Sequence, residues 1–328
     1  MTTETPVAWA ALPKAELHVH LEAAMRPSTA AELAARHGLP AVRQGPYRGQ
    51  ADFVVAYESA RDLVVDLGDL NRIAAEAVAD AAPAGVRWTE MHCVPHNYGG
   101  RLGAPEAVVE AVLDGLGAPG RAGLVLAHNR ARGPAAAWQA LDLALRYQDR
   151  GVVGFGLVGN EADHPPEQYA EVFAAARRAG LRSVPHAGEG AGPWSVRSAW
   201  RALGADRIAH GVRAVEDPGL VEELADADVC LDVCPSSNVA LGASPSLRDH
   251  QLPALLAAGV PVSLGSDGRL FFGVDVADEY RYAHEGMGVD TAALARIARA
   301  SLDHSAAPHH LIRAVHRDID TWVATHAP

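Results

Sequence analysis

The chain has 328 residues, of which 49% are hydrophobic and 21% charged, and its formal net charge is -12. These values are ordinary for a globular enzyme, and a chain of this length can hold one large domain or two ordinary ones. The negative charge, without any basic stripe, argues against nucleic-acid binding. No apolar run approaches the roughly 20 residues needed to span a bilayer, so no membrane partner is expected.

The number of cysteines and the residues at the start of the sequence both favour a reducing compartment. Only three cysteines occur, Cys93, Cys230 and Cys234, an odd number without CxxC spacing. A disulfide framework is therefore not expected, and a reducing compartment fits best. Residues 1–11 contain no basic segment followed by a long apolar core, so no signal peptide is expected. We expect a cytoplasmic protein.

Short apolar, β-branched runs alternate along the chain with longer Ala-, Leu-, Glu- and Arg-rich segments, a pattern typical of strands and amphipathic helices. Strands are predicted at 15–21, 86–93, 123–127, 152–157, 182–185, 207–209, 229–233 and 261–265. Helices are predicted at 28–37, 52–67, 71–82, 105–115, 135–148, 166–179, 195–203, 218–227 and 252–258, and over most of the chain after 276. This alternation predicts a single (β/α)8 barrel over residues 1–328, with an open doubly wound sheet as the alternative.

The first predicted strand carries a possible half of a metal site. In PKAELHVHL, His18 and His20 alternate with apolar residues, so both imidazoles point to one face of the strand. Two imidazoles are too few ligands for zinc, and an HxH can arise by chance in a chain with 16 histidines. The metal interpretation therefore depends on ligands elsewhere in the chain.

Further candidate ligands follow other strands. His186 ends the fifth strand, His210 the sixth, and Asp267 follows the eighth. A barrel gathers such residues from around its C-terminal face, whereas an open sheet gathers them at one switch point. Imidazoles and a carboxylate with an open position suit a hydrolytic zinc site. Glu189, in His-Ala-Gly-Glu, could shuttle a proton beside such a metal.

Other polar residues near strand ends are given structural roles. Three histidines, His92, His96 and His128, are expected to be structural. The CPSSN segment, residues 234–238, is expected to form a serine-rich turn that supports the site, because no base is adjacent in sequence. Arg130 and Arg132 are either solvated or positioned to meet an anionic substrate group.

Six motifs in order, PKAELHVHL, GFGLVGNE, HAGE, RIAHGV, CPSSN and SLGSD, resemble the adenosine deaminase family of metal-dependent hydrolases. The resemblance extends from Leu12 to about Ser301. It implies one divalent ion, zinc in this family, although the same ligands also accept other divalent ions. The implied ligands are His18, His20, His186 and Asp267.

The resemblance also implies roles for three further residues. Glu189 would protonate the purine ring nitrogen next to the amino-bearing carbon. His210 would orient the attacking water and stabilise the charge that develops at the attacked carbon. Gly159 matches the backbone position that contacts the ring in this family.

Two motifs depart from the family pattern at positions that contact the substrate in this family. Where the family has Asp-Gly after HxHL, this chain has Glu22-Ala23. Where the family has paired aspartates, the second contacting the purine five-membered ring, this chain has Asp267-Gly268-Arg269. Loss of a polar contact can change discrimination by large factors. Glu22 and Gly268 are therefore the positions where altered substrate binding is expected.

We therefore predict a zinc-dependent hydrolase that deaminates a 6-aminopurine or adenosine-like nucleoside, with altered recognition. Family relatives that act on adenine or on aminodeoxyfutalosine show how widely recognition varies. The alternatives are the same chemistry on another amino-heterocycle, or a metal-binding barrel without activity. Retention of Glu189 and His210 argues against an inactive barrel. The expected partner is a small-molecule substrate, and the oligomeric state is left open.

Overall fold

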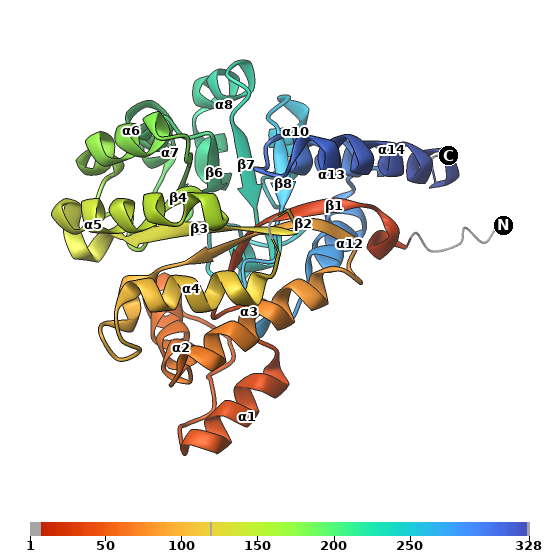
Figure 1. Cartoon of the computed structure of the whole chain (residues 1–328). Coiled ribbons are helices and arrows are strands. Elements are labelled where there is room, and N and C mark those ends of the chain that lie inside the picture. The colour runs from red at the N-terminus through yellow and green to blue at the C-terminus, as the bar shows by residue number, and fades with distance from the viewer. Residues whose placement is uncertain (1–7, 119, 327–328) are drawn as a thin grey trace.

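The computed structural model describes residues 8–118 and 120–326. Its eight strands form one parallel sheet in which each strand pairs with the next in chain order (Figure 1). They are β1 (Lys14–His20), β2 (Val86–Cys93), β3 (Ala122–Asn129), β4 (Val152–Val158), β5 (Arg182–Ala187), β6 (Arg207–His210), β7 (Cys230–Val233) and β8 (Val262–Leu264). This strand order confirms the predicted (β/α)8 barrel and shows that the open doubly wound sheet was wrong.

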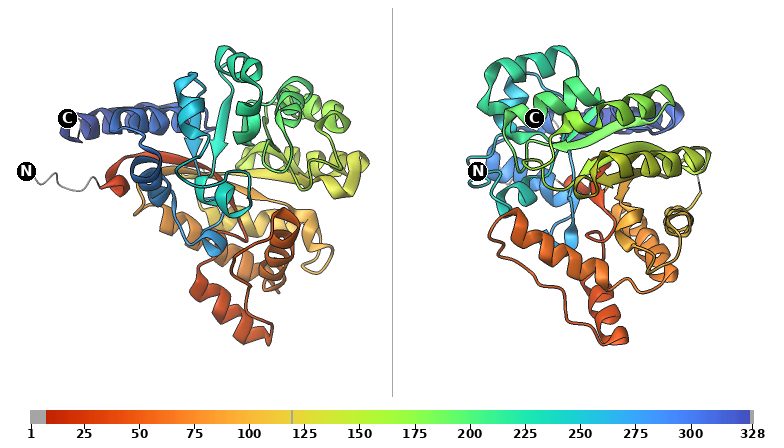
Figure 2. Two further views of the ribbon diagram at one scale, coloured as in Figure 1. Left: turned by 180° about the vertical axis from the view of Figure 1, so that it is seen from behind. Right: turned by 90° about the vertical axis from the view of Figure 1, so that its left-hand side faces the viewer.

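Helices connect the strands and cover the outside of the barrel. They are α1 (Pro27–His37), α2 (Gln50–Asp62), α3 (Leu67–Ala81), α4 (Pro105–Leu116), α5 (Gly133–Arg146), α6 (Ala170–Arg178), α7 (Pro193–Leu203), α8 (Pro218–Asp226), α9 (Pro235–Ala240), α10 (Leu252–Ala257), α11 (Arg269–Phe272), α12 (Val276–Met287), α13 (Thr291–Asp303) and α14 (His309–His326). In both views of Figure 2, α1 and α2 (red and orange) lie on the opposite side of the molecule from α8 (green). None of the described helices combines the length and the apolar character that crossing a membrane requires.

Two local predictions were wrong. The predicted helix 52–67 ends at Asp62, and α3 begins at Leu67 instead of residue 71. The Asp66 side chain accepts a hydrogen bond from the Asp69 backbone N–H in a capping box, which starts α3 earlier. The predicted serine-rich turn at 234–238 is instead helix α9, because Pro235 occupies its first position and favours a helical start.

The barrel closes where β1 meets the segment after β8. The Asp267 backbone N–H donates to the His18 carbonyl, and the His20 N–H donates to the Asp267 carbonyl, both at 3.0 Å. Gly265 allows this approach, because a Cβ atom there would lie 2.6 Å from the His18 carbonyl oxygen. Three predicted metal ligands are thus held next to one another by backbone hydrogen bonds.

A buried polar network fills part of the barrel interior. The Arg207 guanidinium is fully buried and donates to Glu90 at 2.6 Å and to Asp232 at 2.9 Å. The backbone carbonyl of Asp232 lies 3.1 Å from His18 Nδ1. The network therefore anchors a histidine that faces the C-terminal end of the barrel.

Candidate active site

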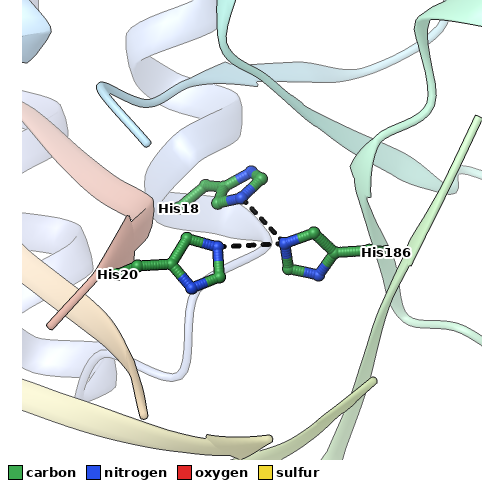
Figure 3. Close-up of side chains that lie close together, drawn as sticks. All are labelled: His18, His20 and His186. Atoms are coloured by element: carbon green, nitrogen blue, oxygen red, sulfur yellow. Dashed lines mark hydrogen bonds between the residues drawn. The ribbon is translucent and has the colours of Figure 1, made fainter. Parts of the chain in front are cut away.

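Three histidines converge at the C-terminal ends of the strands. His18 and His20 on β1 and His186 on β5 point their imidazoles at one another (Figure 3). His186 Nε2 lies 3.2 Å from His18 Nε2 and 3.1 Å from His20 Nε2. Asp267 Oδ1 lies 3.7 Å from His18 Nε2 and 3.5 Å from His20 Nε2. β1, β5 and the segment after β8 thus bring four donor residues together.

The spacing of these donors fits a metal ion. A tetrahedral ion bound about 2.0–2.1 Å from each nitrogen separates the nitrogens by about 3.3 Å. His18 Nδ1 donates to the Asp232 carbonyl, which leaves the Nε2 lone pair facing the cluster. The Ser237 hydroxyl donates to Asp267 Oδ2 at 2.6 Å, so Oδ1 is left to face the histidines. His18, His20, His186 and Asp267 could therefore hold one divalent ion.

The electrostatics of the cluster favour the forms that bind a metal. Burial and the neighbouring histidines lower the pKa of His186 well below its ordinary value, and burial lowers the pKa of His20 to about 4. Burial opposes ionisation of Asp267, but His18 and His20 beside it lower its pKa overall. These shifts favour neutral imidazoles at His20 and His186 and an ionised carboxylate at Asp267, which are the forms that bind a metal.

Glu189 lies in the loop after β5, beside this cluster. Its Oε2 accepts a hydrogen bond from Gln50 Nε2 at 2.9 Å and lies 3.6 Å from His210 Nε2. Burial raises its pKa well above the ordinary value, and the negative charges of Asp267 and Glu161 raise it further. A carboxyl group that keeps its proton at neutral pH can serve as a general acid.

A second glutamate, which the sequence analysis did not single out, holds the Glu189 loop in place. The buried Glu161 carboxylate accepts hydrogen bonds from the backbone N–H groups of Gly188 at 2.8 Å, Glu189 at 3.0 Å and Gly190 at 2.8 Å. It also accepts one from the Ser195 hydroxyl at 2.6 Å. In the sequence, the only indication of a role for Glu161 was its position as the last residue of the motif GFGLVGNE. Glu161 therefore sets the backbone from which Glu189 projects.

His210 is the last residue of β6, and its backbone lies in the left-handed region with φ 67°. The amide of Asn238, on α9, lies 3.1 Å from His210 Nδ1, so that Nε2 faces the cavity. Burial and the neighbouring His18 lower the pKa of His210 to about 3, so its ring is neutral. Strained backbone of this kind is typical of functional sites.

The cluster opens into a cavity of about 150 Å³. Its walls come from the metal-site residues, from α2 and from the ends of β2, β3 and β4. The lining residues are His20, Gln50, Phe53, Val54, Tyr57, Glu58, Arg61, Val94, Asn97, Asn129, Val158, Gly159, His186, Glu189, His210 and Asp267. Gly159 is among these lining residues, and its contact with a bound ring stays a prediction.

The other two predicted substrate-binding residues do not line this cavity. Glu22 is 1% exposed, and its carboxylate accepts hydrogen bonds from the hydroxyls of Tyr57 and Tyr98, both at 2.6 Å. Gly268 packs against Ala23. Tyr57 stands between Glu22 and the cavity as a lining residue. Roles for Glu22 and Gly268 in substrate binding stay predictions.

Arg130 and two histidines predicted to be structural, His92 and His128, do not line the cavity. Arg130 was predicted to be either solvated or in contact with an anionic substrate group, and both predictions were wrong, because it is fully buried and donates to the carbonyls of His164 and His186. His92 is buried with Nε2 3.3 Å from the Leu17 carbonyl, and His128 Nε2 lies 3.0 Å from the Gly133 carbonyl. These contacts give Arg130 a role in supporting the end of β5.

A (β/α)8 barrel with such a donor set and a carboxyl of raised pKa beside it has the arrangement expected of a metal-dependent hydrolase. The sequence model of the adenosine deaminase family matches residues 13–322, so the chain belongs to this family. Its members are hydrolytic deaminases that act on C–N bonds.

Individual relatives agree with this assignment. A Streptomyces coelicolor protein assigned as an adenosine/adenine deaminase is 40% identical over 332 residues, covering 95% of this chain and 97% of the relative. The structure of adenine deaminase from Arthrobacter aurescens has a TM-score of 0.88 at 29% identity, covering 95% of this chain and 99% of that one. A zinc-bound amidohydrolase from Burkholderia ambifaria has a TM-score of 0.86 at 25% identity, covering 99% and 96%. The chain is thus a hydrolytic deaminase for an aminopurine-like substrate.

Proposed function

We propose that this chain is a zinc-dependent deaminase that releases ammonia from the 6-amino position of adenine or of an adenosine-like nucleoside. The observation that carries the proposal is the position of the Glu189 carboxyl, whose pKa burial raises, in one cavity with residues of the His18–His20–His186–Asp267 donor set. A bound zinc ion would supply Lewis-acid activation of the attacking water.

The side chains supply the proton transfers and the orientation. Glu189 donates its proton to the ring nitrogen adjacent to the amino-bearing carbon, which makes that carbon more electrophilic. His210 stabilises the oxygen that adds to this carbon, because its Nε2 faces the same cavity. Gln50 holds Glu189 Oε2 and leaves Oε1 free to face the substrate. The oxygen of water then adds to the amino-bearing carbon. One water proton goes to the amino group, which leaves as ammonia, and the other returns to Glu189, so that the 6-oxo product remains.

The cavity walls support a flat heterocycle as substrate. Phe53, Tyr57 and Val158 offer apolar surface for ring faces, while Asn97 and Asn129 offer amide groups for ring polar atoms. Relatives named for adenine or adenosine deamination support a 6-aminopurine.

A second candidate is the same reaction on another amino-heterocycle. It is favoured by one observation, the occupation of both Glu22 carboxylate oxygens by tyrosine hydroxyls. A carboxylate held in this way is not free to bind the sugar end of a nucleoside. The absence of a side chain at Gly268 removes a ring contact as well.

The first test is ammonia release by the zinc-loaded protein from adenine, from adenosine and from a panel of other amino-heterocycles. Turnover of adenine or adenosine supports the main proposal, and turnover of a panel compound alone supports the second candidate. The absence of ammonia from every compound, with one equivalent of zinc bound, would leave a metal-binding barrel without activity.

The Glu189→Gln variant tests the proton donor. We expect it to lose turnover by at least about a hundredfold while it keeps its metal, because general acid catalysis contributes factors of this size. Glu171→Gln, the same change at an exposed position of α6 outside the cavity lining, is the matched control and should stay active. Full activity of Glu189→Gln would remove Glu189 from the mechanism.

We place this reaction in the cytoplasm. The buried thiols of Cys93, Cys230 and Cys234 are free of disulfide bonds, in keeping with a reducing compartment.

A further inference from the structure

A chain of hydrogen bonds leads from a backbone amide on α10 to His210. The Leu252 N–H donates to His250 Nδ1 at 3.0 Å. His250 Nε2 lies 3.4 Å from Asn238 Oδ1, and Asn238 Nδ2 lies 3.1 Å from His210 Nδ1. All three side chains are buried, so water does not replace these contacts.

The direction of each bond follows from the first one. A backbone N–H is always a donor, so His250 Nδ1 must accept. Burial lowers the pKa of His250 to about 4, so its ring is neutral and its single proton is on Nε2. That proton is donated to Asn238 Oδ1, and the opposite amide orientation would place two donors against each other.

The orientation of Asn238 then decides the tautomer of His210. With Oδ1 toward His250, the amide group Nδ2 donates to His210 Nδ1. His210 must therefore carry its proton on Nε2, the atom that lies 3.6 Å from Glu189 Oε2 at the cavity.

We propose that Asn238 and His250 are positioning residues that hold His210 as the Nε2–H tautomer. His210 consequently presents a hydrogen-bond donor to the cavity, and it has no lone pair there with which to bind a metal or to accept a proton. His18 has the opposite tautomer, because its Nδ1–H donates to the Asp232 carbonyl and its Nε2 is unprotonated. Two histidines in ring contact, with centroids 4.5 Å apart, thus have opposite tautomers and different tasks.

The tautomer can be measured directly in the zinc-loaded protein with 15N-labelled histidine. Ring-nitrogen chemical shifts distinguish protonated from bare nitrogens, and His210→Gln identifies the His210 signals by their loss. We expect a protonated Nε2 and a bare Nδ1. A spectrum with a protonated Nδ1 and a bare Nε2 would overturn the proposal, and this readout does not depend on any substrate.

Variants test the two positioning residues. Asn238→Asp replaces the donor by an acceptor of the same shape, so we expect His210 Nδ1 to become protonated. His250→Leu frees the Asn238 amide to rotate, whereas His250→Gln keeps a donor toward Asn238 Oδ1 and should preserve the wild-type tautomer. An unchanged His210 spectrum in both Asn238→Asp and His250→Leu would show that these residues do not set the tautomer.

The effect on turnover rests on the proposed function. With a deaminase substrate, His250→Leu should lower kcat at least about tenfold with little change in KM, and His250→Gln should restore most of it. Failure of the proposed function would remove this kinetic effect but leave the wild-type spectrum as expected. A merely structural role for His250 would lower stability without moving the His210 signals.

Discussion

The methyl group of Ala23 occupies the space in which a side chain at position 268 would begin. A Cβ atom built on Gly268 would lie 2.3 Å from Ala23 Cβ. Gly268 has an extended backbone with φ −172°, which any residue adopts, so space and not conformation requires glycine here. The departures from the family motifs at Ala23 and at Gly268 are therefore sterically coupled.

This contact predicts the result of restoring the family residue. Gly268→Asp alone should lower the free energy of unfolding by about 1–3 kcal/mol, the usual cost of overpacking. Adding Ala23→Gly should recover most of that loss, because the obstructing methyl is gone. Chemical denaturation of the wild type, both single variants and the double variant measures the coupling. Additive effects in this cycle would show that the two positions are independent.

Glu161 should be essential for the shape of the Glu189 loop. Glu161→Gln places an amide group against some of the four donors that the carboxylate now satisfies. Because hydrogen bonds to a charged group contribute roughly 1.5–3 kcal/mol, we expect a clear loss of thermal stability together with turnover. Glu167→Gln, on an exposed glutamate of the neighbouring segment, is the control. Equal melting temperatures and activities for the two variants would contradict the assignment.

Metal binding should contribute to stability through the histidine cluster. Removing the ion with a chelator should lower the melting temperature of the wild type, since a ligand present at a hundredfold its Kd stabilises by about 2.7 kcal/mol. His186→Ala should bind less than one equivalent of metal and should not respond to the chelator. His128→Ala removes another buried histidine, outside the donor set, and should respond as the wild type does. Metal analysis and thermal denaturation together check this.

Lys14 should make stability depend on pH. Its Nζ is buried and donates to the Trp9 and Ala84 carbonyls at 2.9 and 2.7 Å. Burial lowers its pKa from 10.5 to about 7, so between these values the unfolded chain binds a proton that the folded chain has released. Raising the pH through this window therefore stabilises the fold, by up to about 1.4 kcal/mol per pH unit.

The variant Lys14→Met removes this titration. The difference in unfolding free energy between wild type and variant should grow in favour of the wild type as the pH rises from 7 to 10. Denaturation curves at several pH values measure it. Parallel dependences on pH would mean that Lys14 keeps an ordinary pKa in the folded state.

Much of the fold was predictable because the signals are local. The alternation at His18 and His20 places both on one strand face, and β2 runs from Val86 to Cys93 as predicted. Strand ends mark the C-terminal face of the barrel, so residues such as His186 and Asp267 could be grouped without a structure.

The supporting residues could not be predicted, because their contacts join distant parts of the chain. Gln50 reaches Glu189 across 139 positions, and no local pattern distinguishes it from an ordinary surface glutamine. Glu161 and Asn238 lie within recognised motifs, but the sequence did not indicate which residues they contact. Glu22 looked free to meet a substrate, since nothing in the sequence shows that Tyr57 and Tyr98 approach it.

The closure of the barrel at Asp267 has a consequence for how the protein is made. Asp267 is bonded on both sides to β1, so a ligand from near the end of the chain lies between two from its beginning. During synthesis, His18 and His20 are made first, and nearly 250 further residues must be added before Asp267 is present. The complete set of four proposed ligands therefore cannot assemble before the chain has been synthesised through Asp267, which follows β8.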